Sequence, residues 1–378
     1  MNWPFRPAHE MCEIAVDCVN KTAPTVNYET EFKMIRTTNV KNGFIDLNDV
    51  RYVTVEVFKK WTRRSKPKYG DVILTREAPV GEVGRFTSLD DKVFLGQRLF
   101  HYRPDPKKLD WNFLAYALQS PTVQGRFKGM GFGATVDHVR VGDAEKLPIP
   151  CPPLKVQKKI GNTLSAYDDL IENNRRRIQL LEQSAQMLYK EWFIHLRFPG
   201  HEHVKIKDGV PEGWERKQLV EVAPLKYGKA LKKDSRIPGP YPVYGSSGCV
   251  DTHIKAIVEG PTIIVGRKGN IGSVYWSDKD CNPIDTVYYI AKENSSLRLY
   301  YSLQHISFIS TDVAVPGLNR DFAHSRQILI PDSKINQLFE STVDPMHRQI
   351  KTLQKQNDSL AQARDLLLPR LMNGEIAV

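Results

Sequence analysis

The sequence predicts an α+β fold in which two mixed α/β domains are separated by two long, antiparallel coiled-coil helices. Two stripes of apolar residues with heptad spacing, far apart in the chain, predict the helices. A short strand-like run that ends in proline stands before each stripe, and short β-rich runs fill the segments before these junctions. Because the same order occurs twice, we expect an internal pseudo-two-fold repeat.

The first mixed domain is expected to span residues 1–153. Short runs rich in β-branched and aromatic residues, such as 50–55 and 71–75, alternate with glycine, proline and asparagine. This composition predicts strands joined by turns. One helical segment is expected at 111–118, where apolar residues recur on one face.

The first long helix and the residues that end it are expected at 154–198. Its apolar positions are spaced alternately by three and four residues, as in the seam of a coiled coil. The seam consists of Leu164, Tyr167, Ile171, Ile178, Leu181, Ala185, Leu188 and Trp192. One polar residue, Asn174, lies inside it. A seam asparagine fixes the register of paired helices at some cost in stability.

A connector and the second mixed domain are expected at 199–333, and the second long helix at 334–378. The seam of this helix has the same period. It consists of Val343, Met346, Ile350, Leu353, Leu360, Leu367 and Leu371. Asn357 and Arg364 are polar positions that interrupt it. We expect Pro345 to break or kink the helix near its start.

The two helices are expected to bury their seams on each other. We predict that Asn174 pairs with Asn357 in an antiparallel arrangement, which places Ile178 opposite Leu353. A buried pair of asparagines satisfies its own amides and disfavours slipped registers. The alternative is two unrelated amphipathic surface helices, which are common in proteins.

The junctions before the helices favour the duplication over that alternative. Lys-Leu-Pro-Ile-Pro at 146–150 precedes the first helix, and Gln-Ile-Leu-Ile-Pro at 327–331 precedes the second. A further local match aligns 11–15 with 219–223. Between such matches the two halves share little sequence, as expected for one scaffold with divergent loops.

Composition and charge limit the class of function. The 378 residues are 41% hydrophobic, and Lys plus Arg exceed Asp plus Glu by 54 to 43, so the formal charge is +11. This excess favours a polyanionic partner. The five scattered cysteines include no Cys-x-x-Cys pair, which favours reduced thiols and no zinc site. No apolar run approaches the ~18 residues of a membrane span, so we expect a cytoplasmic protein with no membrane partner.

Motifs for chemistry on DNA or nucleotides are missing from the sequence. The run Cys-Pro-Pro-Leu at 151–154 lacks both functional ends of the Asp/Asn-Pro-Pro-aromatic motif that holds a flipped adenine. The glycines at 129–133 lack the Rossmann spacing, and no Gly-x4-Gly-Lys-Ser/Thr phosphate loop exists. The His-Glu-His run at 201–203 fits a solvated connector better than a metal site. We therefore expect no catalytic residue, no cofactor and no metal on this chain.

Loops with basic and polar side chains are the candidate DNA contacts, because groove readout needs donors and acceptors while Lys and Arg hold phosphates. In the first domain they are Arg76, Lys128, Thr135 and His138. In the second they are Lys229, Lys232, Lys233, Arg267, Lys268, Asn270, Asn319 and Arg320. Arg267 stands on a tight turn after a strand, and Arg76 is its counterpart in the first domain. The alternative for such an arginine is a surface residue that caps a turn.

Several longer stretches carry a family resemblance. They are Leu-Pro-Ile-Pro at 147–150, Glu-Trp-Phe at 191–193, Arg-Phe-Pro-Gly at 197–200, Gly-Trp-Glu at 213–215, and Leu-Leu-Leu-Pro-Arg-Leu-Met-Asn-Gly-Glu-Ile at 366–376. With these, the chain resembles the specificity subunit of type I restriction-modification systems. The resemblance implies a non-catalytic reader of double-stranded DNA, with two target recognition domains that each read half of a bipartite sequence.

The resemblance also implies partners. Two methyltransferase subunits would dock on the paired helices, and restriction/translocase subunits would join the larger assembly. S-adenosylmethionine, ATP and magnesium would then be bound by those partner subunits. The competing interpretation is a two-domain coiled-coil adaptor without DNA specificity. Salt separates the two, because DNA affinity should fall with salt by a log–log slope of about −0.9 per neutralised phosphate.

Overall fold

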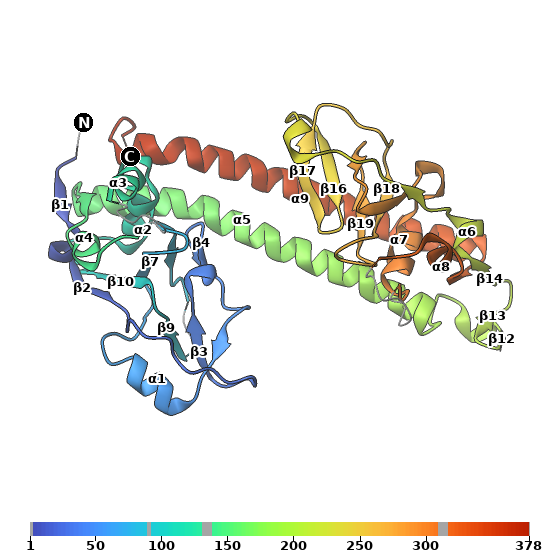
Figure 1. Cartoon of the computed structure of the whole chain (residues 1–378), viewed down its shortest axis with the longest axis horizontal. Coiled ribbons are helices and arrows are strands. Elements are labelled where there is room, and N and C mark those ends of the chain that lie inside the picture. Colours follow the sequence, from blue (N-terminus) through green and yellow to red (C-terminus); the bar gives the residue numbers. More distant parts are fainter. Residues whose placement is uncertain (1–2, 89–91, 131–137, 309–316, 378) are drawn as a thin grey trace. The chain divides into compact units, whose positions relative to one another are not determined.

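The computed structural model describes residues 3–88, 92–130, 138–308 and 317–377 (Figure 1). Two compact units contain Met1–Asn174 with Lys355–Val378, and Arg175–Gln354. Two long helices, α5 (Leu154–Tyr189) and α9 (Ser333–Met372), contribute residues to both units. None of the helices in the described segments combines the length and the apolar character needed for a membrane span.

The first unit is built on a four-stranded antiparallel sheet. Its order is β2 (Cys12–Asp17), β10 (Leu99–Pro104), β7 (Val72–Thr75) and β8 (Val83–Arg85). Every residue of β7 is buried, as expected for a strand covered on both faces. Helix α2 (Trp111–Gln119) packs on this sheet and begins where the Asp110 carboxylate accepts a hydrogen bond from the Phe113 amide at 2.9 Å. The strand predicted at 71–75 and the helix predicted at 111–118 are thus confirmed.

A smaller sheet covers the other side of the first domain. Strands β6 (Arg51–Tyr52), β3 (Phe32–Ile35) and β9 (Lys92–Leu95) form it, and α1 (Val55–Trp61) follows β6. The single strand predicted at 50–55 was therefore wrong beyond residue 52. The Thr54 side chain caps the N-terminus of α1, and this local hydrogen bond ends the extended backbone.

The second unit repeats the first sheet. Its order is β15 (Lys226–Tyr227), β21 (Val287–Ile290), β18 (Thr262–Gly266) and β19 (Val274–Ser277), with the same antiparallel ladders as the first sheet. Helix α7 (Leu297–Gln304), capped by Ser296, takes the place of α2. A separate three-stranded sheet of β17 (Gly248–His253), β16 (Tyr241–Gly245) and β20 (Asn282–Pro283) completes this domain. The predicted duplication is confirmed.

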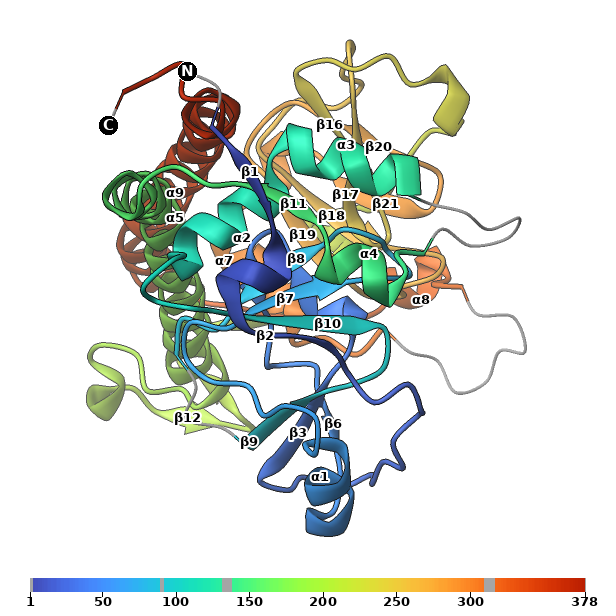
Figure 2. The same ribbon diagram turned by 90° about the vertical axis from the view of Figure 1, so that its left-hand side faces the viewer.

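In each domain the first strand pairs with the last strand, which directly precedes a long helix. Strand β1 (Phe5–Pro7) pairs with β11 (Pro148–Pro150) in the first unit (Figure 2), and β14 (Glu215–Gln218) pairs with β22 (Gln327–Ile330) in the second. Short helices α4 (Val141–Glu145) and α8 (Arg320–His324) precede β11 and β22.

The alignment of 11–15 with 219–223 was wrong. The counterpart of α6 (Leu219–Val222) is the 3-10 helix Ala8–Met11, because the Ala8 amide donates to Leu147 where the Leu219 amide donates to Arg326. Residue 12 already begins β2. The segments 11–15 and 219–223 have similar residues, but the first lies mostly on a strand and the second on a helix.

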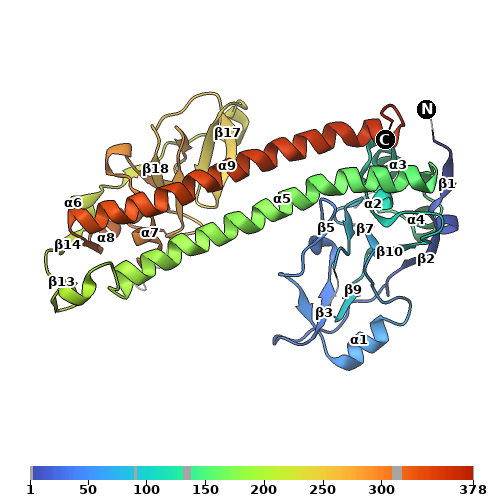
Figure 3. The ribbon, with the colours of Figure 1, turned by 180° about the vertical axis from the view of Figure 1, so that it is seen from behind.

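The seams of α5 and α9 face each other in both units, and they run antiparallel (Figure 3). In the first unit Ile160 and Leu164 pack in one core with Leu371. In the second unit Ala185 and Tyr189 pack with Val343. All predicted interface residues are buried or half-buried, namely Ile171, Asn174, Ile178, Leu181, Leu188, Ile350, Leu353, Asn357, Leu360 and Leu367.

The asparagine pair lies within the first unit. The Asn174 Nδ2 atom donates to the Asn357 Oδ1 atom at 3.0 Å, and Asn174 is buried. The predicted pair is therefore confirmed. It provides each amide with a partner in a seam that is otherwise largely apolar.

Both helix ends differ in detail from expectation. The first helix closes in a π-helical turn at Lys190–Ile194, which buries Trp192 and Phe193. The break expected at Pro345 was wrong, because α9 is helical without interruption from Ser333 to Met372. A proline removes one intrahelical hydrogen bond, and the neighbouring Phe339 and Val343 are fully buried, which offsets this loss through packing.

We predict that changing Asn174 and Asn357 together to Leu raises the free energy of unfolding by about 1 kcal/mol, because two apolar side chains replace a buried polar pair. The single change Asn174→Leu should instead lower it by about 1–3 kcal/mol, because the Asn357 amide loses its partner. Urea unfolding of the three proteins measures both values. Equal destabilisation by the single and double changes would contradict this description of the pair.

Candidate nucleic-acid interface

One backbone frame recurs at the end of a central strand in each domain. Directly after β7, the Arg76 amide donates to the carbonyl of Arg98 at 2.9 Å, and the Arg76 carbonyl accepts from the Val139 amide at 2.9 Å. Directly after β18, the Arg267 amide donates to Thr286 at 2.9 Å and its carbonyl accepts from Leu318 at 2.8 Å. We call this pair of backbone hydrogen bonds the backbone frame. It joins the end of the central strand to the residue before the next strand of the sheet and to the loop before the short helix. Arg76 and Arg267 therefore occupy equivalent positions.

In the second domain two arginines share one aromatic ring. The guanidinium carbon of Arg267 lies 5.0 Å from the centre of the Tyr227 ring, and that of Arg320 lies 5.1 Å from it. Arg267 also donates through Nη1 to the Asp285 carbonyl at 3.1 Å. Among the described residues Arg267 has no carboxylate partner, whereas Arg320 lies 4.0 Å from Asp321. The ring of Tyr227 therefore orients an arginine whose charge is not paired within the described part of the domain. We call Tyr227, Arg267 and Arg320 the arginine cluster.

Lysines adjoin the arginine cluster through the segment 283–286. The Lys229 amide donates to Pro283 at 3.0 Å, and the Lys268 amide donates to Thr286 at 3.1 Å. Gly228 stands between Tyr227 and Lys229 and must be glycine, because a Cβ there would lie 2.1 Å from the Ile284 carbonyl oxygen. The side chains of Lys229 and Lys268 are exposed.

The other candidate DNA contacts of the second domain differ in their surroundings. Asn270 is exposed on the same turn as Arg267. Asn319 caps α8, since its Oδ1 atom accepts from the Phe322 amide at 3.0 Å, which commits one acceptor of its side chain to the helix. Lys232 and Lys233 are exposed at a 3-10 turn, and no contact joins their described side chains to the arginine cluster.

In the first domain Arg76 does not reach the surface. It is only 6% exposed, and its Nη1 atom donates to the Val139 carbonyl at 3.0 Å. Arg76 therefore caps a carbonyl, in agreement with the alternative given above, and its buried guanidinium is not accessible to DNA. His138 is half-buried, and its backbone forms an isolated antiparallel β-bridge with that of Glu77. Thr135 and the side chain of Lys128 lie outside the described residues.

Two arginines beside Arg76 were not singled out from the sequence. Arg98 forms an ion pair with Glu77 at 2.9 Å and remains 47% exposed, and it borders a hollow of about 210 Å³ together with Arg36. Thr37 and Gln97 add polar groups to the same hollow. No sequence motif marks them, because the pairing of β10 with β7, which sets Leu99 opposite Thr75, and the hydrogen bond from the Arg76 amide to the Arg98 carbonyl bring this turn to the strand end only in the folded chain. Tyr227 was not singled out either, because its contacts with Arg267 and Arg320 join segments that are far apart in the sequence.

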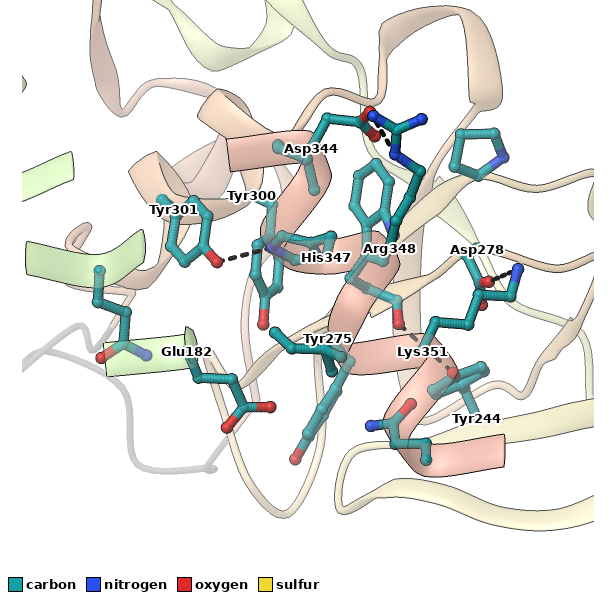
Figure 4. Close-up of a pocket in the computed structure, with 16 residues that line it drawn as sticks. Glu182, Tyr244, Tyr275, Asp278, Tyr300, Tyr301, Asp344, His347, Arg348 and Lys351 are labelled. Atoms are coloured by element: carbon teal, nitrogen blue, oxygen red, sulfur yellow. Dashed lines mark hydrogen bonds and ion pairs between the residues drawn. The ribbon is translucent and has the colours of Figure 1, made fainter. Parts of the chain in front are cut away.

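A cavity of about 550 Å³ lies elsewhere in the second unit, between the domain and the helices (Figure 4). Tyr275, Trp276, Tyr300 and Tyr301 line it, and none of its lining residues belongs to the arginine cluster. The Tyr301 hydroxyl and the His347 Nε2 atom are 2.7 Å apart. Burial lowers the pKa of His347 despite the opposing effect of the nearby carboxylates of α9 and the domain.

Comparison with known proteins identifies the family. The family model for the type I restriction modification DNA specificity domain matches residues 1–183 and 211–362. The chain belongs to this family. The two matched segments correspond to the two repeats of the structure. The adaptor interpretation receives no support from the relatives.

Individual relatives agree with this assignment. The chain is 26% identical to the specificity subunit of the type I restriction enzyme MjaIX of Methanocaldococcus jannaschii, over 87% of this chain and 82% of that one. It is 22% identical to the HindI specificity subunit of Haemophilus influenzae, over 82% and 87%. The crystal structure of an S subunit from M. genitalium has the same fold, with a TM-score of 0.60, 20% identity, and coverage of 98% and 96%.

We predict a pH dependence that arises from His347. The unfolded chain takes up a proton on histidine near pH 6.5, whereas the folded protein resists protonation because burial lowers the pKa of His347. Its contribution to stability is therefore present above about pH 6.5 and is lost as the pH falls through the folded-state pKa. Urea unfolding measures the free energy of unfolding at pH 7.5 and at pH 5.5. Between these two pH values, this free energy should fall by less in His347→Gln than in the unmodified protein.

The control for this prediction is His203→Gln, which changes an exposed histidine on the connector. It should show the same loss between the two pH values as the unmodified protein. A His347→Gln protein with that same loss would contradict the assignment.

Proposed function

We propose that this chain is the DNA-reading specificity subunit of a type I restriction-modification complex, in which each domain reads one half of a bipartite sequence. The observation that carries the proposal is the backbone frame around Arg76 and Arg267, repeated at the same strand end of two domains. A repeated frame with different side chains suits two half-sites of different sequence. The family and the excess of positive charge support it.

In the second domain the arginine cluster is the proposed contact with DNA. An arginine can donate to both acceptors of a guanine edge or hold a phosphate, and Tyr227 restricts its orientation in advance. Lys229, Lys268 and Asn270 would add phosphate and base contacts, with Lys232 and Lys233 as more distant phosphate contacts. In the first domain the proposed surface contains Arg98 and Arg36, with His138 beside them.

The partners follow from the same proposal. Two methyltransferase subunits would dock on the paired helices, one for each repeat, and restriction/translocase subunits would complete the assembly. S-adenosylmethionine, ATP and magnesium would be bound by these partners. This chain would supply the sequence specificity and none of the catalytic groups. The proposal places the complex in the cytoplasm, where it has access to DNA.

The proposal is tested by expressing the chain with its companion methyltransferase subunit and mapping the methylated adenines in host DNA. We expect one bipartite sequence with two defined halves. The change Arg267→Ala should weaken discrimination in one half by about 1–3 kcal/mol and leave the other half unchanged, because the arginine cluster belongs to one domain.

The matched control is Arg216→Ala, which removes an exposed arginine of β14 outside the arginine cluster. It should leave both halves unchanged. Equal loss of discrimination in both halves with Arg267→Ala would contradict the assignment of this residue to one half-site. A methylation pattern that does not depend on this chain would contradict the proposed function itself.

A further inference from the structure

A buried ionic cluster joins four segments of the first unit. The Asp168 side chain on α5 is only 1% exposed, and its Oδ1 atom lies 2.6 Å from Arg364 Nη1 on α9. Its Oδ2 atom accepts from Arg85 Nη2 on β8 at 3.0 Å and from the Tyr116 hydroxyl on α2 at 2.5 Å. We call these four residues the Asp168 cluster. It attaches the sheet and the covering helix of the first domain to both long helices.

The Asp168 cluster depends on each of its members. Arg85 is fully buried, and its Nε and Nη1 atoms have no hydrogen-bond partner among the described residues, so Asp168 is the anion that compensates its charge. The Tyr116 ring lies 4.7 Å from the guanidinium carbon of Arg85 and adds a cation–π contact. Arg364 is the least buried ionic member, with 20% of its side chain exposed. It is therefore the member whose charge can be removed at least cost to folding.

The second repeat lacks this cluster. Asp168 and His347 occupy the same position counted from the start of their helices, and so do Arg364 and Ala185. Arg85 pairs with Val72 on the strand that ends before Arg76, and Trp276 pairs with Ile263 on the strand that ends before Arg267. The second domain is thus attached through Trp276, His347 and Tyr301. Glu182 and Gln186, which flank Ala185 on α5, line the cavity of Figure 4.

This difference shows that the fold can form without an ionic cluster at the position of the Asp168 cluster. The same sheet, covering helix and paired helices form in the second unit with an aromatic attachment and no buried carboxylate at the equivalent position. A buried ion pair is weak support for stability, and it fixes geometry through directional hydrogen bonds. The structure therefore assigns it a task specific to the first domain.

We propose that Asp168 and Arg364 are positioning residues for sequence reading by the first domain, an inference that rests on the proposed function. Asp168 holds Arg85 on β8, and β8 pairs with β7, which ends at Thr75. The next residue, Arg76, carries the backbone frame with Arg98. Arg364 thus belongs to the helix of the second repeat and controls the half-site that is read by the first.

The test uses the complex with its companion methyltransferase subunit and maps methylated adenines. A chimera that carries residues 1–150 of a related specificity subunit identifies the half read by the first domain. Arg364→Met should reduce discrimination in that half by about tenfold, the size of one charge-assisted hydrogen bond, and leave the other half unchanged. Arg364→Lys keeps the charge with fewer donors and should restore most of the discrimination.

Arg348→Met is the matched control, because it removes an exposed arginine of the same helix that pairs with Asp344 instead of Asp168. It should leave the first half unchanged. A purely structural role for Arg364 would reduce the amount of active complex and spare discrimination, and that result would overturn the proposal. Equal relaxation of both halves, or equal effects of the Met and Lys changes, would also overturn it.

The outcomes separate this inference from the function on which it rests. If the unmodified complex methylates no bipartite sequence, the proposed function fails and the inference falls with it. If it does methylate one, and Arg364→Met leaves the first half as sharply defined as before, only the positioning role fails. Melting temperatures of the variants show whether a lost signal arises from unfolding.

Discussion

The structure depends on the mutual burial of two helix seams. Each long helix has one apolar stripe, and in both units that stripe is covered by the other helix. A stripe of leucine and isoleucine alone would permit several registers. The hydrogen bond between Asn174 and Asn357 distinguishes one of them, because any slip would bury an amide without a partner. The attachment of each domain to the helices follows from that register.

Duplication provides two domains with one backbone plan, and side chains then give them different properties. The clearest case is the equivalent pair Arg76 and Arg267. One guanidinium turns inward to cap the Val139 carbonyl, while the other lies against Tyr227 near the surface. The hydrogen-bonded frame around them is the same. Equivalent positions in a repeat therefore share backbone geometry without sharing side-chain contacts.

Much of the fold could be predicted because it depends on local periodicity. The seams and the helix that became α2 repeat apolar residues at regular intervals, the strand that became β7 is a short apolar run between turn residues, and the asparagine pair follows from the register. The extent of β6 was missed because one side chain, Thr54, caps a helix. The break at Pro345 did not occur, because burial of neighbouring residues outweighs one lost hydrogen bond.

The candidate site was less predictable, because side-chain direction depends on contacts distant in sequence. Nothing near Arg76 shows that its guanidinium will meet Val139, and nothing near Arg98 places that turn at the strand end. Asp168 lies beside the seam, so heptad analysis passed over it. Arg364 was noticed as a polar interruption, and its partner became visible only in the folded chain.

Under the proposed function, the two long helices connect the two reading domains, so we expect the register that the asparagine pair sets to determine the preferred distance between the half-sites. The most direct test measures binding of the assembled complex to DNAs whose half-sites are separated by spacers that vary one base pair at a time. The unmodified complex should show a sharp optimum, and the protein with Leu at positions 174 and 357 should show a broader one. An unchanged, equally sharp optimum in the double variant would contradict the claim.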